Sequence, residues 1–299
     1  MPARYWILII TLGIAFGGSF FFNAILLKEL GPMTISMGRV FLGALGCWVW
    51  VSAKGKNPFV SWAVLCQLMI LGLFQYAAPF ALLPLAQKYV SSGMAGTVNG
   101  MTPVMVVLVS HFWVGGEKIS PAKSVGVVIG FSGIVILAWP ALQASGSEFW
   151  AILVAFLAPV SYSVALNYVR RLRGIDPTVM TAWALSCATI LLVPTALAIE
   201  GVPVITKIET WVSLAILGFV MTSICFIAIF WLLPKTGATT VSTVTFIAPI
   251  SAVMLGIAFL GETLTQSHVA GMGVILTGLL MIDGRFVKLL ATPRSPNSA

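Results

Sequence analysis

Apolar residues dominate the chain in runs of about 20, and short connectors between these runs hold most of the charges and turn residues. About 20 apolar residues in a helix are enough to cross the hydrocarbon core of a bilayer. No connector is long or polar enough to form a separate soluble domain. The pattern predicts an all-α integral membrane protein of ten transmembrane helices, at residues 5–27, 33–53, 60–84, 92–115, 121–140, 148–169, 177–199, 210–233, 237–260 and 266–287.

The chain contains one unit twice. Residues 116–120 (GEKIS) recur 145 residues later as 261–265 (GETLT), each followed by a glycine-rich run. Pro103 matches Pro249 at nearly the same offset. Each copy contains five predicted spans, and an odd number forces the two copies to insert in opposite directions. We therefore predict two inverted five-helix repeats at 1–144 and 145–287, with a cytoplasmic tail at 288–299, an arrangement typical of secondary transporters.

The distribution of lysine and arginine predicts the orientation. With the N-terminus in the cytoplasm, the inner ends of the spans hold twelve of the 16 basic residues, the outer connectors hold three, and Arg39 lies inside a span. Positively charged connectors stay on the cytoplasmic side. Both termini are thus expected in the cytoplasm, with the protein in the cell inner (plasma) membrane.

Composition removes several classes of protein from consideration. The chain is 59% hydrophobic and 8% charged, whereas soluble domains contain about 25% charged residues. The net charge of +8 reflects topology and an affinity for anionic lipid head groups. A nucleic-acid partner would require a basic face on a soluble module, so none is expected.

Glycines predict where helices approach one another most closely. In lipid, small residues let two backbones come together, and Gly126, Gly130 and Gly133 share one helical face. Gly271 and Gly278 have the same spacing as Gly126 and Gly133. These two spans are expected to pack against a neighbour or against each other. A homodimer interface is the alternative, although we expect a monomer.

Two prolines, Pro103 and Pro249, lie inside the fourth and ninth spans and predict helix breaks. Each removes the hydrogen bond to the carbonyl four residues earlier, which frees the carbonyls of Asn99 and Thr245. Irregular backbone survives at membrane depth only against protein or a wet cavity. We predict a hydrated midplane cavity here, with Asn99 and Thr245 as the first candidates for substrate binding. The alternative is a kink closed by local hydrogen bonds, for example from Thr102.

Other polar side chains lie at a similar depth, and intramembrane polar residues normally face the interior of the bundle. Interhelical hydrogen bonding is the competing explanation for each of them. As a set they predict a substrate pathway, lined by Gln75, Tyr76, Thr222, Ser223, Ser19, Asn23 and Ser163.

Arg39 is the one charged residue inside a span, about 9 Å from its outer end at 1.5 Å per residue. One interpretation is that its long side chain snorkels to the lipid head groups. The other is that it attracts the carboxylate of a substrate or holds an outer gate closed.

No acidic residue lies deep in a span, so the usual carrier of proton or sodium coupling is not evident. The sequence contains no metal-binding, phosphate-binding or nucleophile motif. We therefore expect no cofactor, no metal and no enzyme activity. Glu117 and Glu262, in the two repeated turns, are interpreted as structural.

The repeated turn, Gly-Glu followed by Ser or Thr and a glycine-rich span, resembles that of the EamA family in the drug/metabolite transporter (DMT) superfamily. Arg39 also matches an arginine common early in the second span of that family. The resemblance covers residues 5–287. It implies ten helices in two inverted repeats and the export of small metabolites from the cytoplasm.

Within that family the chain is most similar to the YddG-type exporters of aromatic amino acids, through Val98 and Asn99 ahead of Pro103 and through the region of Gln75 and Tyr76. The resulting hypothesis is an inner-membrane exporter of amino acids of broad specificity, including aromatic ones. It would work by alternating access around a midplane cavity. The alternatives are export of other small solutes or drugs, or a channel-like facilitator.

Overall fold

The computed structural model describes residues 2–143, 147–172 and 174–283, and within these ranges every regular element is a helix. The predicted tail at 288–299, and the boundary between the two copies at 144–145, lie outside the described residues. Two segments, η1 and η3, are π-helical, and η2 is a 3-10 turn. In chain order the elements are α1 (Ala3–Leu26), α2 (Pro32–Ala53), α3 (Trp62–Gly72), η1 (Leu73–Ala77), α4 (Ala78–Gln87), α5 (Ser92–Asn99), α6 (Thr102–Phe112), α7 (Pro121–Gln143), α8 (Ser147–Tyr168), η2 (Val169–Arg171), α9 (Pro177–Glu200), α10 (Ile208–Ala215), η3 (Ile216–Ile224), α11 (Cys225–Thr236), α12 (Ala238–Val241), α13 (Val244–Leu260) and α14 (Gln266–Asp283).

Eight helical stretches of the described chain are long and apolar enough to cross a membrane. They correspond to the first eight predicted runs, with α3–η1–α4, α5–α6, α8–η2 and α10–η3–α11 each forming one stretch. The ninth run is divided, because α12 ends at Val241 and α13 begins at Val244. The shorter α13 and the 18-residue α14 occupy the ninth and tenth runs.

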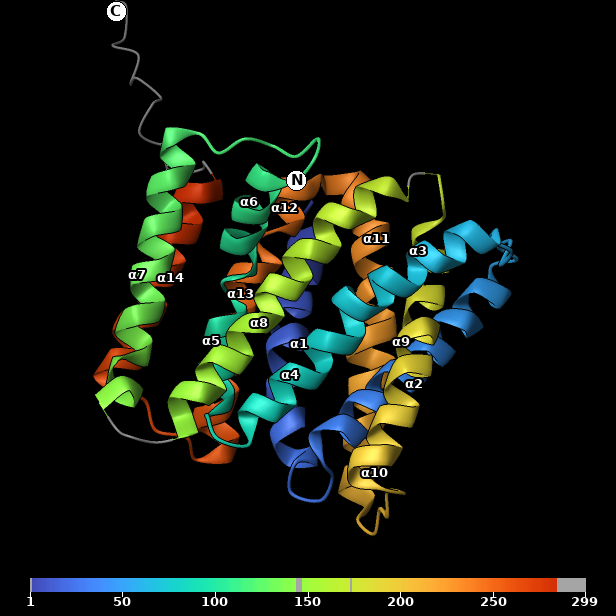
Figure 1. The fold of residues 1–299 in the computed structure, drawn as a ribbon, viewed down its shortest axis with the longest axis horizontal. Helices are drawn as coiled ribbons and strands as arrows, with labels where there is room; N and C mark the ends of the chain where they lie inside the picture. Colours follow the sequence, from blue (N-terminus) through green and yellow to red (C-terminus); the bar gives the residue numbers. More distant parts are fainter. Residues whose placement is uncertain (1, 144–146, 173, 284–299) are drawn as a thin grey trace, which may run out of the picture.

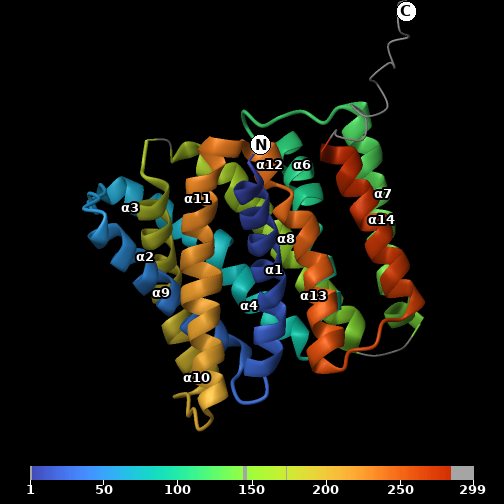
Figure 2. The same ribbon diagram turned by 180° about the vertical axis from the view of Figure 1, so that it is seen from behind.

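The helices form a bundle with two distinct ends (Figures 1 and 2). The N-terminus, the α6–α7 connection and the end of α14 lie at the upper end in Figure 1. The α1–α2, α4–α5 and α13–α14 connections lie at the lower end. The two Gly-Glu turns are therefore at opposite ends of the molecule.

Helix packing has the same pattern in both copies. α2 packs against α9, and α7 packs against α14. The contact of α1 with α13, the first span with the ninth, has its counterpart in the contact of α8 with α6, the sixth span with the fourth. The contact of α2 with η3 has its counterpart in the contacts of α9 with α3 and η1. Exchanging the two copies thus reproduces the packing.

The π-helical segments occupy equivalent positions in the two copies. The tripeptide Ile-Leu-Gly marks both positions: residues 70–72 directly precede η1, and residues 216–218 begin η3. A Cβ on Gly72 would lie 2.4 Å from the Ala184 carbonyl oxygen of α9, and one on Gly218 would lie 2.4 Å from the Leu42 Cβ of α2. Single-turn π-bulges are frequent at functional sites, and here η1 packs against α9 while η3 packs against α2.

The glycine-rich helices α7 and α14 stand side by side at one edge of the bundle (Figure 1). A Cβ on Gly126 would lie 2.8 Å from the Gly278 carbonyl oxygen, and one on Gly133 would lie 2.9 Å from that of Gly271. The prediction that these spans pack against each other is confirmed. Their glycine faces are occupied within one chain and are not free for a second copy.

A further proline, Pro84, frees a backbone carbonyl that the sequence analysis did not single out. Pro84, inside α4, cannot donate a hydrogen bond to the carbonyl of Phe80, four residues earlier. The Ser36 hydroxyl of α2 lies 2.5 Å from that carbonyl oxygen and 2.6 Å from the Pro32 carbonyl oxygen, so its single proton is shared between the two acceptors. A serine on a neighbouring helix thus satisfies the acceptor that the proline frees.

Replacing Ser36 by alanine is expected to destabilise the protein, because the buried Phe80 carbonyl would lose its donor at a cost of about 1–3 kcal/mol. The double variant Ser36→Ala, Pro84→Ala restores a backbone N–H four residues after Phe80 and should recover much of the loss. Thermal unfolding of the purified variants in detergent measures both. Equal loss in the single and double variants would show that the serine acts in another way.

Candidate functional site

Arg39 lies at the centre of the candidate site, and its side chain is only 5% exposed. It projects from α2 into the bundle, where its Nε donates to Thr222 Oγ1 at 3.1 Å and its Nη2 donates to Ser19 Oγ at 3.3 Å. These hydroxyls come from η3 and α1, so three spans from both copies meet at the guanidinium. The snorkelling interpretation is wrong, because the side chain is buried among helices.

Aromatic rings surround the same group. The Arg39 guanidinium carbon lies 3.7 Å from the centre of the Phe80 ring, a cation–π contact. Phe80 meets Tyr76 edge-on with ring centres 5.8 Å apart, and Tyr76 meets Phe226 at 5.4 Å. Phe16 continues the row at 5.9 Å from Phe226. The rings come from η1, α4, α11 and α1, and they form an apolar wall next to a cation.

The positive charge of Arg39 has no acidic partner in the described residues. The two ion pairs found there are Lys56–Asp176 and Lys123–Glu117, and both lie in connectors or at helix ends. The guanidinium has five N–H groups, and the described residues accept two hydrogen bonds from it. A buried guanidinium without a counter-charge is costly, which makes an anionic ligand the natural complement of this position.

The polar neighbours of Arg39 are themselves anchored. Thr222 donates to the Leu217 carbonyl at 2.9 Å, a bond five residues back along the π-helical turn. Ser223 donates to the Gly43 carbonyl of α2 at 2.8 Å. The π-helical turn in η3 thus presents two consecutive hydroxyl residues to α2. Of the predicted site residues, the structure brings together Arg39, Ser19, Thr222, Ser223 and Tyr76.

The predicted freed carbonyl of Asn99 accepts a local hydrogen bond. Thr102 Oγ1 donates to it at 2.7 Å, as in the alternative of a kink closed by local hydrogen bonds. A carbonyl oxygen has two lone pairs, so the assignment of Asn99 to substrate binding stays a prediction. Pro103 lies in the first turn of α6. The side-chain Oδ1 of Asn99 is buried and has no hydrogen-bond partner.

The second break also differs from the prediction. The ninth span is interrupted between Val241 and Val244, ahead of Pro249, which lies inside α13. Thr245 donates to the Ser242 carbonyl at 2.7 Å. Pro249 packs near Gly100, where an added Cβ would lie 2.8 Å from its ring. Pro249 thus marks a contact between the fourth and ninth spans.

The remaining predicted residues form a bond to another helix, form a bond within their own helix, or have none. Asn23 donates to Gln87 Oε1 at 3.0 Å, and Gln87 donates to the Phe20 carbonyl at 2.9 Å. Ser163 is fully buried and donates to the Val160 carbonyl. Gln75 is half-buried and has no hydrogen bond to a described residue. Gln87 was missed because the third span was predicted to end at residue 84.

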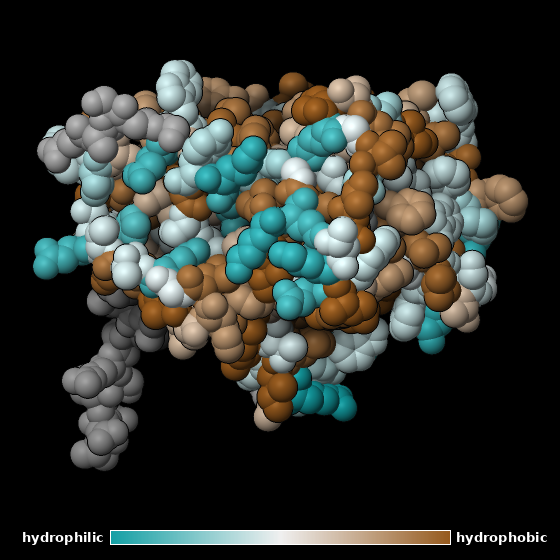
Figure 3. All heavy atoms as spheres, turned by 90° about the horizontal axis from the view of Figure 1, so that it is seen from below, coloured by the Kyte–Doolittle hydropathy of each residue, from teal (hydrophilic) through white to brown (hydrophobic). Residues whose placement is uncertain are grey.

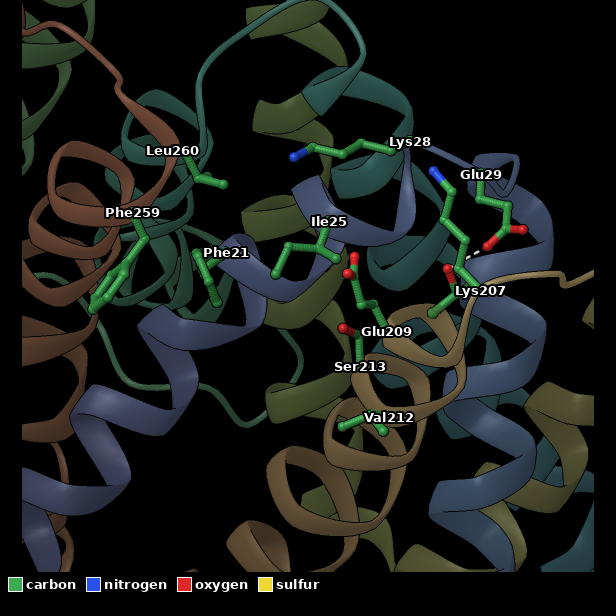
Figure 4. Close-up of a pocket in the computed structure, with 11 residues that line it drawn as sticks. Phe21, Ile25, Lys28, Glu29, Lys207, Glu209, Val212, Ser213, Phe259 and Leu260 are labelled. Carbon is green, nitrogen blue, oxygen red and sulfur yellow. Dashed lines mark hydrogen bonds between the residues drawn. The ribbon is translucent and has the colours of Figure 1, made fainter.

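The lower end of the bundle shows hydrophilic side chains in the middle of a face that is otherwise largely hydrophobic (Figure 3). A pocket at this end is lined by the charged residues Lys28, Glu29, Lys207 and Glu209 on one side. Apolar residues, including Phe21 and Phe259, line the other side (Figure 4). Glu29 accepts hydrogen bonds from the Thr206 N–H at 2.8 Å and from its hydroxyl, and also from the Thr210 hydroxyl.

These bonds lower the pKa of Glu29 to about 2, with the Thr206 hydroxyl as the largest cause. A carboxyl whose pKa is lowered by folding contributes stability above its unfolded pKa, and this contribution is lost only as the pH falls through the folded value. Glu29 therefore joins the α1–α2 and α9–α10 connections as a carboxylate throughout the neutral range. The lower end is tied together across the two copies.

Long apolar helices surrounding a buried polar cluster define a multi-pass membrane protein. Comparison with known proteins identifies its family. The EamA-like transporter family matches this chain twice, at residues 4–139 and 149–283. The chain belongs to the EamA-like transporter family.

Similar proteins span nearly the whole chain. The uncharacterized transporter YoaV of Bacillus subtilis is 24% identical over 277 residues, covering 91% of this chain and 94% of its own. An uncharacterized transporter of Archaeoglobus fulgidus is 26% identical over 286 residues, covering 93% and 98%. A solved crystal structure at 19% identity superposes with a TM-score of 0.67 over 99% of this chain and 100% of its own, a likeness that concerns the fold alone. Membership of a transporter family does not support an enzyme activity for this protein.

Proposed function

We propose that the protein is an inner-membrane secondary transporter that exports amino acids with apolar or aromatic side chains. The observation that carries the proposal is the buried Arg39 guanidinium, without an acidic partner in the described residues, at the end of a row of aromatic rings. Arginine pairs with carboxylates through two parallel hydrogen bonds. The α-carboxylate of an amino acid supplies that anion, and its side chain lies along the rings.

The same charge argues against other solute classes. A cationic drug would be repelled by Arg39 and needs a buried acidic partner, which the described bundle interior does not contain. A phosphorylated solute carries two negative charges and usually meets several basic groups, whereas Arg39 stands alone inside the spans. A zwitterion or monoanion with an apolar portion is the best match.

The proposed architecture is a pair of inverted five-helix units at 1–144 and 145–287, with ten spans and cytoplasmic termini. Three findings support it: the family matches each unit separately, the helix packing repeats when the units are exchanged, and the two Gly-Glu turns lie at opposite ends (Figure 1). In this topology the lower end in Figure 1 is extracellular. The two units would rock about Arg39 and expose it alternately to the two sides.

Competition for uptake into everted membrane vesicles tests the substrate class. We expect excess unlabelled phenylalanine or leucine to block uptake of labelled phenylalanine, because each supplies a carboxylate. The corresponding amino-acid amides, equal in shape but without the carboxylate, should compete at least tenfold more weakly. Vesicles without the protein give the background. Amides that compete as well as the amino acids would refute carboxylate recognition.

A channel-like facilitator is the alternative transport mode, and counterflow separates it from a carrier. Unlabelled substrate trapped inside vesicles should drive transient accumulation of labelled substrate when two alternating states share one site. A channel produces no such overshoot.

A further inference from the structure

The carboxylate of Glu262 joins the two units of the chain at the lower end. Its Oε1 accepts from the Ser92 N–H at 2.6 Å, and its Oε2 accepts from the Gly93 N–H at 3.1 Å. These N–H groups belong to the first turn of α5 and have no partner within that helix. An anion is favoured at this position by the helix dipole as well. The α13–α14 turn is thereby fastened to the fourth span.

The surroundings of Glu262 are shaped to hold this carboxylate. A Cβ on Gly256 would lie 2.2 Å from Glu262 Oε2, so only glycine leaves room for it. The Glu262 N–H also donates to the Gly256 carbonyl at 3.1 Å. About one turn further into the bundle, α5 and α13 are in close contact, since a Cβ on Gly96 would lie 2.5 Å from the Ala252 Cβ. The fourth and ninth spans are closed against each other at this end.

The repeat counterpart, Glu117, is arranged differently. It pairs at 2.5 Å with Lys123, in the first turn of the following helix α7, and its side chain is 67% exposed. This bond lowers the pKa of Glu117, with a smaller contribution from the charge of Arg170. Glu262 and Glu117 occupy matching positions of the repeat but have different partners. Glu262 bonds the other unit, whereas Glu117 bonds a residue of its own unit.

We propose that Glu262 and Glu117 are alternating latches of the transport cycle. Glu262 holds the extracellular end closed in the state seen here, by bonding the start of the fourth span. In the opposite state Glu262 is released, and Glu117 leaves Lys123 to hold the cytoplasmic ends of the fourth and ninth spans together. The inference rests on the alternating-access part of the proposed function and is independent of the substrate.

The native Cys225 reports which end is open, because it is buried, 4% exposed, and lies three residues after Thr222, which accepts a hydrogen bond from Arg39. With Cys47, Cys66 and Cys187 replaced by alanine, a membrane-impermeant maleimide is applied to right-side-out vesicles. We expect Glu262→Gln to raise the labelling rate of Cys225 at least tenfold over the parent. Glu117→Gln should leave that rate equal or lower. A rise in both variants, or in neither, would overturn the proposal.

A second pair of variants leaves both glutamates intact. Gly256→Ala places a methyl group where the Glu262 carboxylate lies and should raise Cys225 labelling as Glu262→Gln does. Gly273→Ala, on α14, is the matched control, because a Cβ there meets nothing within 4 Å. Size-exclusion chromatography confirms that each variant is folded. If Gly256→Ala labels like Gly273→Ala while remaining folded, Glu262 is not the latch.

The Cys225 labelling experiment tests the latch, and the competition experiment tests the substrate class, so either hypothesis can be refuted without the other. If no amino acid is transported but Glu262→Gln still opens the extracellular end, the substrate assignment is wrong and the latch stands. If carboxylate-dependent competition is observed but labelling does not change, the latch is wrong and the proposed function stands.

Discussion

Replacing Gly278 by leucine is expected to abolish accumulation of folded protein. A Cβ at this position would lie 2.6 Å from the Gly130 nitrogen and 2.7 Å from the Gly126 carbonyl oxygen. These are backbone atoms of α7, which no change of rotamer can move away. Overpacking by single methylene groups already costs about 1–3 kcal/mol, and a leucine requires the two helices to separate.

Gly273→Leu on the same helix provides the comparison, since a Cβ at this position meets nothing within 4 Å. Its effect should stay within about 0.5 kcal/mol, as for other substitutions that touch nothing. The yield of monodisperse protein and the thermal midpoint in detergent measure both variants. Equal yields for Gly278→Leu and Gly273→Leu would mean that the α7–α14 contact does not hold the fold together.

The existence of the long helices could be predicted because it depends on local composition. A run of 20 apolar residues in a bilayer has to satisfy its backbone hydrogen bonds internally, and a helix does so without help from neighbours. The close approach of α7 and α14 was also within reach, since small residues at fixed spacing indicate a contact. The sequence did not determine which helix this glycine face contacts, because the same glycine spacing suits a neighbouring span and a second copy of the chain.

The details of the site depend on tertiary contacts that no local pattern contains. The direction of the Arg39 side chain is set by hydroxyls 20 residues earlier and 183 residues later. The π-helical turn that presents Thr222 depends on the contact between η3 and α2. The closing of the Asn99 carbonyl by Thr102, in contrast, spans three residues. That outcome was one of the two alternatives and could not be chosen without coordinates.

The ends of the spans were the least accurate part of the prediction. Because the third span was predicted to end too early, Gln87 was not recognised as a buried polar residue. Gln87 follows the predicted end of the third span at residue 84, yet α4 continues to it and buries its amide between Asn23 and Phe20. Pro84 made the earlier end plausible. The α2 serine that satisfies the freed Phe80 carbonyl is what allows the helix to continue, and it belongs to another span.

Arg39→Gln is expected to abolish carboxylate-dependent transport without weakening the fold. A charge-assisted hydrogen bond contributes about 1.5–3 kcal/mol, so losing the arginine should lower affinity for an amino acid by roughly 10- to 150-fold for each hydrogen bond lost. Arg39→Lys keeps the charge but loses the planar fork, and we expect it to fall between the parent and Arg39→Gln.

The thermal stability of the Arg39→Gln variant distinguishes a role of Arg39 in substrate binding from a role in holding the fold together. Thr222 has its own acceptor in the Leu217 carbonyl, and Ser19 its own in the Met221 sulfur, so removing the guanidinium leaves neither hydroxyl without a bond. It also removes a buried charge that has no acidic partner in the described residues. The thermal midpoint of Arg39→Gln should thus equal or exceed that of the parent in the absence of substrate. Added phenylalanine should raise the midpoint of the parent alone, because a ligand stabilises only the protein that binds it. A lower midpoint for Arg39→Gln, with an unchanged response to phenylalanine, would make Arg39 a structural residue and remove the basis for carboxylate recognition.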